Sequence, residues 1–265
     1  MSNINESLLE MYYFSPTINA FKDLYGKRAI KFYKPTQHQE GWLGFDQAFV
    51  KSEYSDDEFL DKIKENIEEK GEMEKFYFGY FMQYKKMKKV QRIVRPTSIS
   101  IPNHFTEEPY FRFELKTQST KNNKVSQHKT LMLLHQNVKN AFVYYVSPML
   151  FELSAFTEPN LDDLRIINID SAPPLANWDL DKRHFIMYEN EKSEEPFWCS
   201  EPVKGKEISF TKWIENMQDH KRLSGEDVLK LISDTKKYSK EHSSLTGNRN
   251  ENMLPASLTI VEVQN

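Results

Sequence analysis

The chain has 265 residues and a formal net charge of -3, with 38% hydrophobic and 13% aromatic residues. This length fits one medium domain or a domain with an appendage, and the aromatic content argues against wholesale disorder. The chain has 8 glycines and contains neither GxGxxG nor GxxxxGK[ST], which argues against glycine loops that bind phosphate. Its 1 cysteine excludes an internal disulfide and a multi-cysteine zinc site. It has no long apolar run and no signal-peptide pattern, so we expect a soluble cytoplasmic protein without a membrane partner.

Hydrophobic periodicity predicts alternating helices and strands in the first half of the chain. The expected elements are a helix over residues 6–26 interrupted near Pro16, a short strand over 30–33, a strand or turn-strand over 41–50, a helix over 58–70, a strand buried on both faces over 75–85 and a half-buried strand over 110–115.

The second half begins with a helix near Ser126 that has an apolar face of leucine and valine. The expected elements after it are a strand over 141–146 stopped by Pro148, short strands within 162–169 and 183–188, helices over 209–219 and 225–242, and a last strand over 257–263. The order predicts an α/β or α+β fold with a central mixed sheet flanked by helices. We expect an α/β core over 1–172 and a mainly helical C-terminal region over 173–265.

Charge is unevenly distributed along the chain. The segment 53–75 carries ten acids and four bases, whereas 85–95 carries six bases and no acid. A charge run of this kind is equally consistent with a solvated face and with a phosphate-contacting edge. On the second interpretation, five side chains would bind nucleic acid: Lys86, Lys88, Lys89, Arg92 and Arg95.

A possible metal site lies on the strand that ends at Lys85. Because side chains alternate along a strand, Gln83 and Lys85 share one face. Upstream, Asp46 is an acid in apolar surroundings. Phosphodiester hydrolysis uses a divalent cation held by oxygen ligands and a cation near the attacking water. Asp46 and Gln83 could hold the ion, and Lys85 could orient the water and stabilise the developing charge.

This arrangement resembles the PD-(D/E)xK restriction-endonuclease-like superfamily over about residues 35–148. The features that carry the resemblance are an acid, a [DEQ]-x-Lys on a neighbouring strand, and then a helix and a further strand. The resemblance implies a restriction-endonuclease-like fold with Asp46, Gln83 and Lys85 as catalytic residues and Asp46 and Gln83 as ligands of Mg²⁺, or of Mn²⁺ in its place. This sequence departs from the family pattern at Gln83, where an acid is usual.

The same resemblance implies accessory residues. Glu40 is the nearest candidate for the family's extra glutamate on an earlier helix, and Gln127 and His128 occupy the start of the following helix. A second match, Glu114-Leu115-Lys116, competes with the first. We prefer the Gln83 and Lys85 pair because its strand is more buried, and Glu114 is kept as a carboxylate from an adjacent strand.

These features predict a magnesium-dependent endonuclease that hydrolyses DNA phosphodiester bonds, and the resemblance implies a role in bacterial restriction or antiphage defence. The C-terminal helices would cover the site or bind a partner subunit, and a homo-oligomer is equally open. The alternative is a catalytically inactive nuclease-fold subunit that binds nucleic acid or a partner protein, which Gln83 favours by removing a charge. An enzyme based on His184 or Cys199 is a third, weaker interpretation.

Overall fold

The computed structural model describes thirteen stretches of the chain: residues 4–26, 30–33, 61, 64–65, 75–92, 101–103, 105–106, 108–118, 125–151, 158–174, 183–199, 202–243 and 257–264. The predicted strand over 41–50 lies outside them, as does most of the predicted helix over 58–70. No helix in the described ranges is long and apolar enough to cross a membrane.

The four long helices of the described ranges are α1 (Glu6–Tyr25), α3 (Gln127–Asn137), α4 (Phe210–His220) and α5 (Gly225–Ser243). The strands are β1 (Ile30–Tyr33), β2 (Lys75–Tyr84), β3 (Lys88–Val90), β4 (Tyr110–Leu115), β5 (Val143–Pro148), β6 (Leu164–Asn168), β7 (His184–Tyr188), β8 (Phe197–Cys199), β9 (Val203–Lys204), β10 (Glu207–Ile208) and β11 (Ser257–Gln264).

The larger sheet has six strands in the order β1-β11-β2-β5-β6-β10. Its central pair, β2 and β5, is parallel, and every other neighbouring pair is antiparallel. Helix α3 lies on the connection between the two parallel strands, which need a long crossover. The predicted mixed sheet flanked by helices is therefore confirmed.

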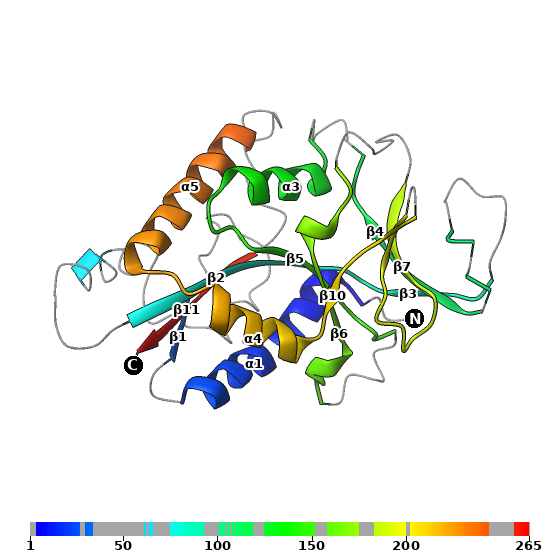
Figure 1. Ribbon diagram of the computed structural model, residues 1–265, viewed down its shortest axis with the longest axis horizontal. Coiled ribbons are helices and arrows are strands. Elements are labelled where there is room, and N and C mark those ends of the chain that lie inside the picture. Colours follow the sequence, from blue (N-terminus) through cyan, green and yellow to red (C-terminus); the bar gives the residue numbers. More distant parts are fainter. Residues whose placement is uncertain are drawn as a thin grey trace.

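The two faces of β2 build two hydrophobic cores. Phe78 and Tyr80 pack in a cluster with residues of α1 and α4, whereas Tyr77 and Phe81 pack in a cluster with residues of α3 and α5. Figure 1 shows these helix pairs on opposite sides of the strands. Because both faces are covered, the strand is an almost continuous apolar run, as predicted.

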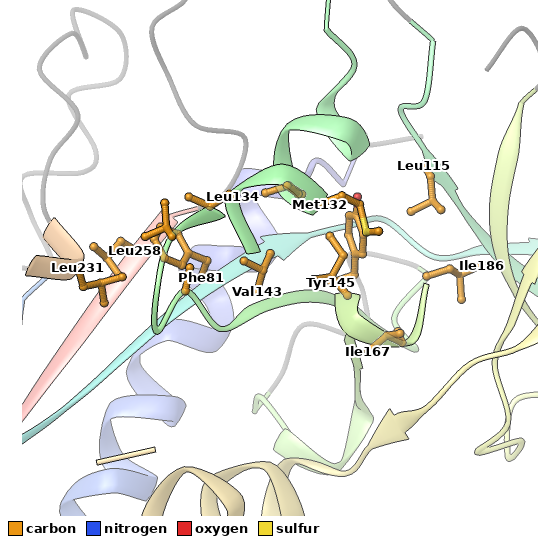
Figure 2. Close-up of a cluster of buried hydrophobic side chains, with 14 of the residues drawn as sticks. Phe81, Leu115, Met132, Leu134, Val143, Tyr145, Ile167, Ile186, Leu231 and Leu258 are labelled. Atoms are coloured by element: carbon orange, nitrogen blue, oxygen red, sulfur yellow. The ribbon is translucent and has the colours of Figure 1, made fainter. Parts of the chain in front are cut away.

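The second sheet has five strands in the order β3-β4-β7-β8-β9. Its inner face joins the core of the first sheet, and Figure 2 shows Leu115 of β4 and Ile186 of β7 at one end of the cluster that contains Phe81 and Val143. Strand β3 was not predicted, because the basic segment at its start resembled a loop. The half-buried pattern predicted for 110–115 is confirmed in β4.

The C-terminal segment is not a separate helical region. It contains α4 and α5 as expected, but it also supplies β7, β8 and β9 to the second sheet and β10 and β11 to the first. Strand β11 pairs with β1 on one side and β2 on the other. Residues on both sides of position 172 therefore build both sheets.

Helix α1 runs through Pro16 without the expected interruption. Proline removes one backbone donor from a helix. Next to it, the hydroxyl of Thr17 donates a hydrogen bond of 2.8 Å to the carbonyl of Tyr13. Tyr13 and Phe21 are fully buried, so packing of this face holds the helix in place.

A buried ion pair lies at the edge of the first sheet, and its arginine also bonds the turn that follows β7 of the second. Arg165 of β6 donates to Glu207 of β10 at 3.1 Å, and its other nitrogen donates to the carbonyl of Glu191 at 2.8 Å. The Glu207 side chain is 4% exposed. Burial raises the pKa of Glu207 to about 7, although Arg165 opposes this rise. Burial and then Glu207 hold the pKa of Tyr188 in β7 well above its ordinary value.

We expect Gly79→Ala to destabilise the protein, because a Cβ at position 79 would lie 2.6 Å from Cδ2 of Leu231. The cost should be about 1–3 kcal/mol in the free energy of unfolding. Leu231→Ala alone should cost about 2–5 kcal/mol. Urea denaturation of the double variant should give less than the sum of both losses, and strict additivity would contradict this close packing of α5 on β2.

Glu207 should make stability fall as the pH rises from about 4.5 to about 7, because its raised pKa lets the folded state bind the proton more tightly than the unfolded state. Glu207→Gln is neutral throughout, so its stability relative to the wild type should increase over that window. Urea unfolding at pH 4.5 and pH 8 measures the difference. Glu195→Gln, at an exposed pair with Lys204, is the control, and an equal pH response in both variants would contradict the assignment.

Candidate functional site

Four polar side chains from three distant elements meet at the end of β2. The ammonium of Lys85 donates to Oε1 of Gln127 at 2.6 Å and to the carboxylate of Glu6 at 3.2 Å. Nε2 of Gln127 donates to Oε1 of Gln83 at 3.2 Å. The structure thus brings together Gln83, Lys85 and Gln127 from the predicted set and adds Glu6.

The backbone fixes this position. Tyr84 is opposite Val146 in the parallel ladder, and the Lys85 amide continues it by donating to the Val146 carbonyl at 2.8 Å. The hydroxyl of Ser147 donates to the Lys85 carbonyl at 2.9 Å. The site therefore lies beside the carboxyl end of a parallel pair, where α/β proteins commonly bind ligands.

Two helices begin at the site. Ser126 caps α3 and places Gln127 as its first residue, while Asn5 caps α1 and places Glu6 as its first residue. Both caps are ordinary side-chain acceptors for orphan amides, so the local sequence determines where each helix begins. The partial positive ends of both helices consequently face the neighbourhood of Lys85.

Lys85 is buried to an unusual degree for a lysine. Its side chain is 1% exposed, whereas that of Glu6 is 36% exposed. Burial lowers the pKa of Lys85, the nearby Glu6 carboxylate raises it, and Lys116 lowers it further. The net direction is downward, so at a given pH a larger fraction of this lysine is neutral than of a lysine in water.

The hydrogen bonds have one consistent direction. A lysine ammonium only donates, so Gln127 presents its oxygen to Lys85 and its amide nitrogen to Gln83. Gln83 then presents its own nitrogen to the carbonyl of Tyr84, at 2.9 Å. The Lys85 charge therefore orients both glutamines, and Oε1 of Gln83 lies toward the site.

Glu6 is the acid that sequence reasoning missed. The resemblance implied a glutamate from an earlier helix, and Glu40 was the nearest candidate. Glu40 and Asp46 lie outside the described residues. The useful signal was already present, because the helix predicted over 6–26 begins with an acid. An acid in a first helical turn is common for electrostatic reasons alone, which made this signal weak.

His128 faces the core. It is fully buried, and its Nδ1 lies 2.9 Å from the hydroxyl of Tyr145. Burial, with smaller contributions from His184 and Lys85, lowers the pKa of His128 to about 3. The imidazole is therefore neutral at ordinary pH, and its ring stacks on Tyr145 at 5.9 Å.

Glu114 is held by an arginine. Its carboxylate accepts two hydrogen bonds from Arg183, at 2.8 and 2.6 Å, and Arg183 lowers the pKa of Glu114. Glu114 is still close enough to raise the pKa of Lys85 slightly. The competing Glu114–Lys116 motif therefore borders the site of Lys85, with its carboxylate engaged in this ion pair.

The basic side chains predicted to bind nucleic acid do not all lie on one face, because strand β3 runs through the basic segment. Lys88 lies opposite Arg112 of β4, whereas Lys89 lies opposite Phe111, with its ammonium 5.9 Å from that ring. Side chains alternate, so the two lysines point to opposite faces of the second sheet. Lys86 is half-buried, Arg92 is exposed and Arg95 lies outside the described residues.

The oxygen atoms at the site suit a hard cation. Mg²⁺ prefers oxygen ligands in octahedral geometry, and the described donors are the Glu6 carboxylate and the Gln83 amide oxygen. Asp46 would have to supply a further carboxylate. Within the described residues, no group of three or more His, Cys, Asp and Glu side chains could hold a metal ion.

Cys199 is buried, and burial raises the pKa of its thiol to about 12.

Comparisons with known proteins give no relative: no protein-family model, no curated protein and no solved structure matches the chain. Geometry and chemistry must therefore carry the functional argument.

Glu6→Gln should lower the pKa of Lys85 further, because it removes the nearest charge that favours the ammonium while burial persists. A ¹³C-NMR titration of lysine-labelled protein measures this, with Lys85→Met used to assign the signal. Glu10→Gln on the same helix is the matched control. An unchanged or higher pKa of Lys85 in Glu6→Gln would contradict the ion pair.

Proposed function

We propose that the protein is a metal-dependent nuclease that hydrolyses DNA phosphodiester bonds. The observation that carries this proposal is the cluster of Glu6, Gln83, Lys85 and Gln127 at the end of the parallel pair. The three predicted members, Gln83 and Lys85 at the end of β2 and Gln127 at the start of α3, form one hydrogen-bonded chain. A role in bacterial restriction or antiphage defence is part of the proposal and follows from the resemblance alone.

In this proposal, Lys85 positions the attacking water and stabilises the charge of the reaction. As an ammonium held by Glu6 and Gln127, it can orient the water and stabilise charge on the phosphate oxygens through its N–H donors. Gln127 fixes the direction of the ammonium through the 2.6 Å contact. Glu6 holds the ammonium from the exposed side.

Glu6 and Gln83 would hold a divalent ion through their side-chain oxygens, together with Asp46 from outside the described residues. A bound Mg²⁺ or Mn²⁺ would supply neutralisation of phosphate charge that the described residues provide only in part. Gln83 is oriented for this role, because its nitrogen is engaged with the Tyr84 carbonyl.

The second candidate is a nuclease-fold subunit that binds nucleic acid or a protein without cleaving it. It is favoured by the way the cluster satisfies itself: Lys85 is paired with Glu6, and the two glutamine side chains are hydrogen-bonded to each other. A site of this kind keeps its arrangement whether or not it catalyses a reaction. Cleavage assays decide between the two candidates.

We expect purified protein with Mg²⁺ or Mn²⁺ to cut plasmid or single-stranded DNA, and Lys85→Met to lower the rate by about 10²-fold or more. Methionine keeps the buried volume without the ammonium. Lys230→Met, at an exposed lysine paired with Asp234 on α5, is the matched control and should retain full activity. Circular dichroism and thermal melting establish that both variants fold.

The absence of cleavage of duplex DNA, single-stranded DNA and RNA with either ion would sink the nuclease proposal. Equal activity of Lys85→Met and wild type would remove Lys85 from the reaction. Asp46→Ala tests the remaining sequence-predicted ligand, and it should lose activity in the same assay.

A further inference from the structure

We infer that the cationic end of the β3–β4–β7 face, beside the buried cluster of Ile101, Phe105 and Phe185, binds the phosphate backbone of DNA through Lys88, Arg112 and Arg183. Neither Arg112 nor Arg183 belongs to the basic run seen in the sequence. That the ligand is DNA rests on the proposed function, whereas the cationic face rests on the geometry of the second sheet.

The register brings these cations together. Lys88 and Arg112 are direct partners in the antiparallel β3–β4 pair, and Glu114 and Phe185 are direct partners in the β4–β7 pair. Direct partners share a face, and residues two apart on one strand also share it, so Lys88, Arg112, Glu114 and Phe185 are neighbours. Arg183 reaches the same face, because it bonds Glu114.

Like charges directly opposite each other destabilise a sheet. Lys88 and Arg112 form such a pair, and the nearest acid, Glu114, gives both of its oxygens to Arg183. Within the described ranges, neither Lys88 nor Arg112 forms an ion pair. Among the described residues, Lys88, Arg112 and Arg183 thus stand against the single carboxylate of Glu114 in this group, and an anion would relieve the repulsion between Lys88 and Arg112.

Arg112 is held ready for a ligand. Its guanidinium lies 4.3 Å from the centre of the buried Phe185 ring and 5.9 Å from that of Tyr110. Among the described residues, its buried Nε has no hydrogen-bond partner. Stacking on aromatic rings restricts the planar group, so that it meets a phosphate oxygen in a fixed orientation.

The face adjoins the Lys85 site. Strand β3 begins three residues after Lys85, and β4 ends where the carbonyl of Lys116 accepts the amide of His128 at the start of α3. Glu114 and Lys116 both affect the pKa of Lys85 electrostatically. A DNA strand that contacts Lys88 and Arg112 would therefore have a phosphate within reach of the site.

The test is a measurement of DNA binding in the absence of metal, made by fluorescence anisotropy over a series of salt concentrations. Lys88→Gln and Arg112→Gln should each weaken binding about five- to tenfold and reduce the slope of log affinity against log salt by about 0.7–0.9. Glu114→Gln should strengthen binding, because it releases Arg183 and removes the opposing charge. Arg112→Lys keeps the charge and should retain most of the affinity.

Lys230→Gln removes the same charge from α5, which lies at the opposite end of the molecule from β3 in Figure 1, and should bind as the wild type does. Thermal melting confirms that each variant folds. The inference would be overturned if Lys88→Gln and Arg112→Gln bound DNA with the same affinity as Lys230→Gln. It would also be overturned if Glu114→Gln bound DNA with unchanged or lower affinity. In the same assay the wild type should have a lower affinity for RNA than for DNA, and a higher affinity for RNA would overturn the choice of DNA.

Failure of the two proposals can be told apart. The three charge variants test the binding face, and Lys85→Met tests cleavage, because it leaves Lys88, Arg112 and Arg183 in place. If the charge variants weaken binding as expected but no cleavage occurs, this inference stands and the nuclease proposal fails. If cleavage occurs and the charge variants bind normally, the nuclease proposal stands and this inference fails.

Discussion

The burial of one ammonium group constrains the whole arrangement around the end of β2. Moving a lysine charge out of water costs several kcal/mol unless partners compensate for the loss of hydration. Lys85 is 1% exposed and obtains its partners from Glu6 on α1 and Gln127 on α3. Both helices must therefore begin at this end of the sheet, and their caps place them there. Packing of Leu9 and Leu131, both fully buried, then fixes each helix against its own face.

The same constraint gives the site its electrostatic character. Two helix N-termini and a buried ammonium converge, and each favours a negative group. Glu6 supplies that group in the structure, and its 36% exposure shows that the carboxylate lies at the boundary with solvent. Burial of Lys85 and the placement of the Glu6 carboxylate are thus two consequences of one geometry.

Sequence reasoning predicted the parts of the site that depend on local pattern. The period of two along the aromatic run placed Gln83 and Lys85 on one face, and the helix predicted to begin near Ser126 placed Gln127 at a helix start. Contacts over long sequence separations escaped it. Glu6 lies 79 positions from Lys85, and Arg183 bonds Glu114 across 69 positions. Neither contact leaves a periodic signal, because pairing between strands and helices is decided by the tertiary fold.

The parallel pairing of β2 with β5 explains why the site lies at this particular end of β2. Strand β5 pairs with β2 through Gln83 and Tyr84, and the Lys85 amide continues the ladder by donating to the Val146 carbonyl. The Gln83 side chain donates to the Tyr84 carbonyl at the same place. The end of a central strand has polar backbone and side-chain groups to satisfy, and the first residues of α1 and α3 supply partners for the side chains there.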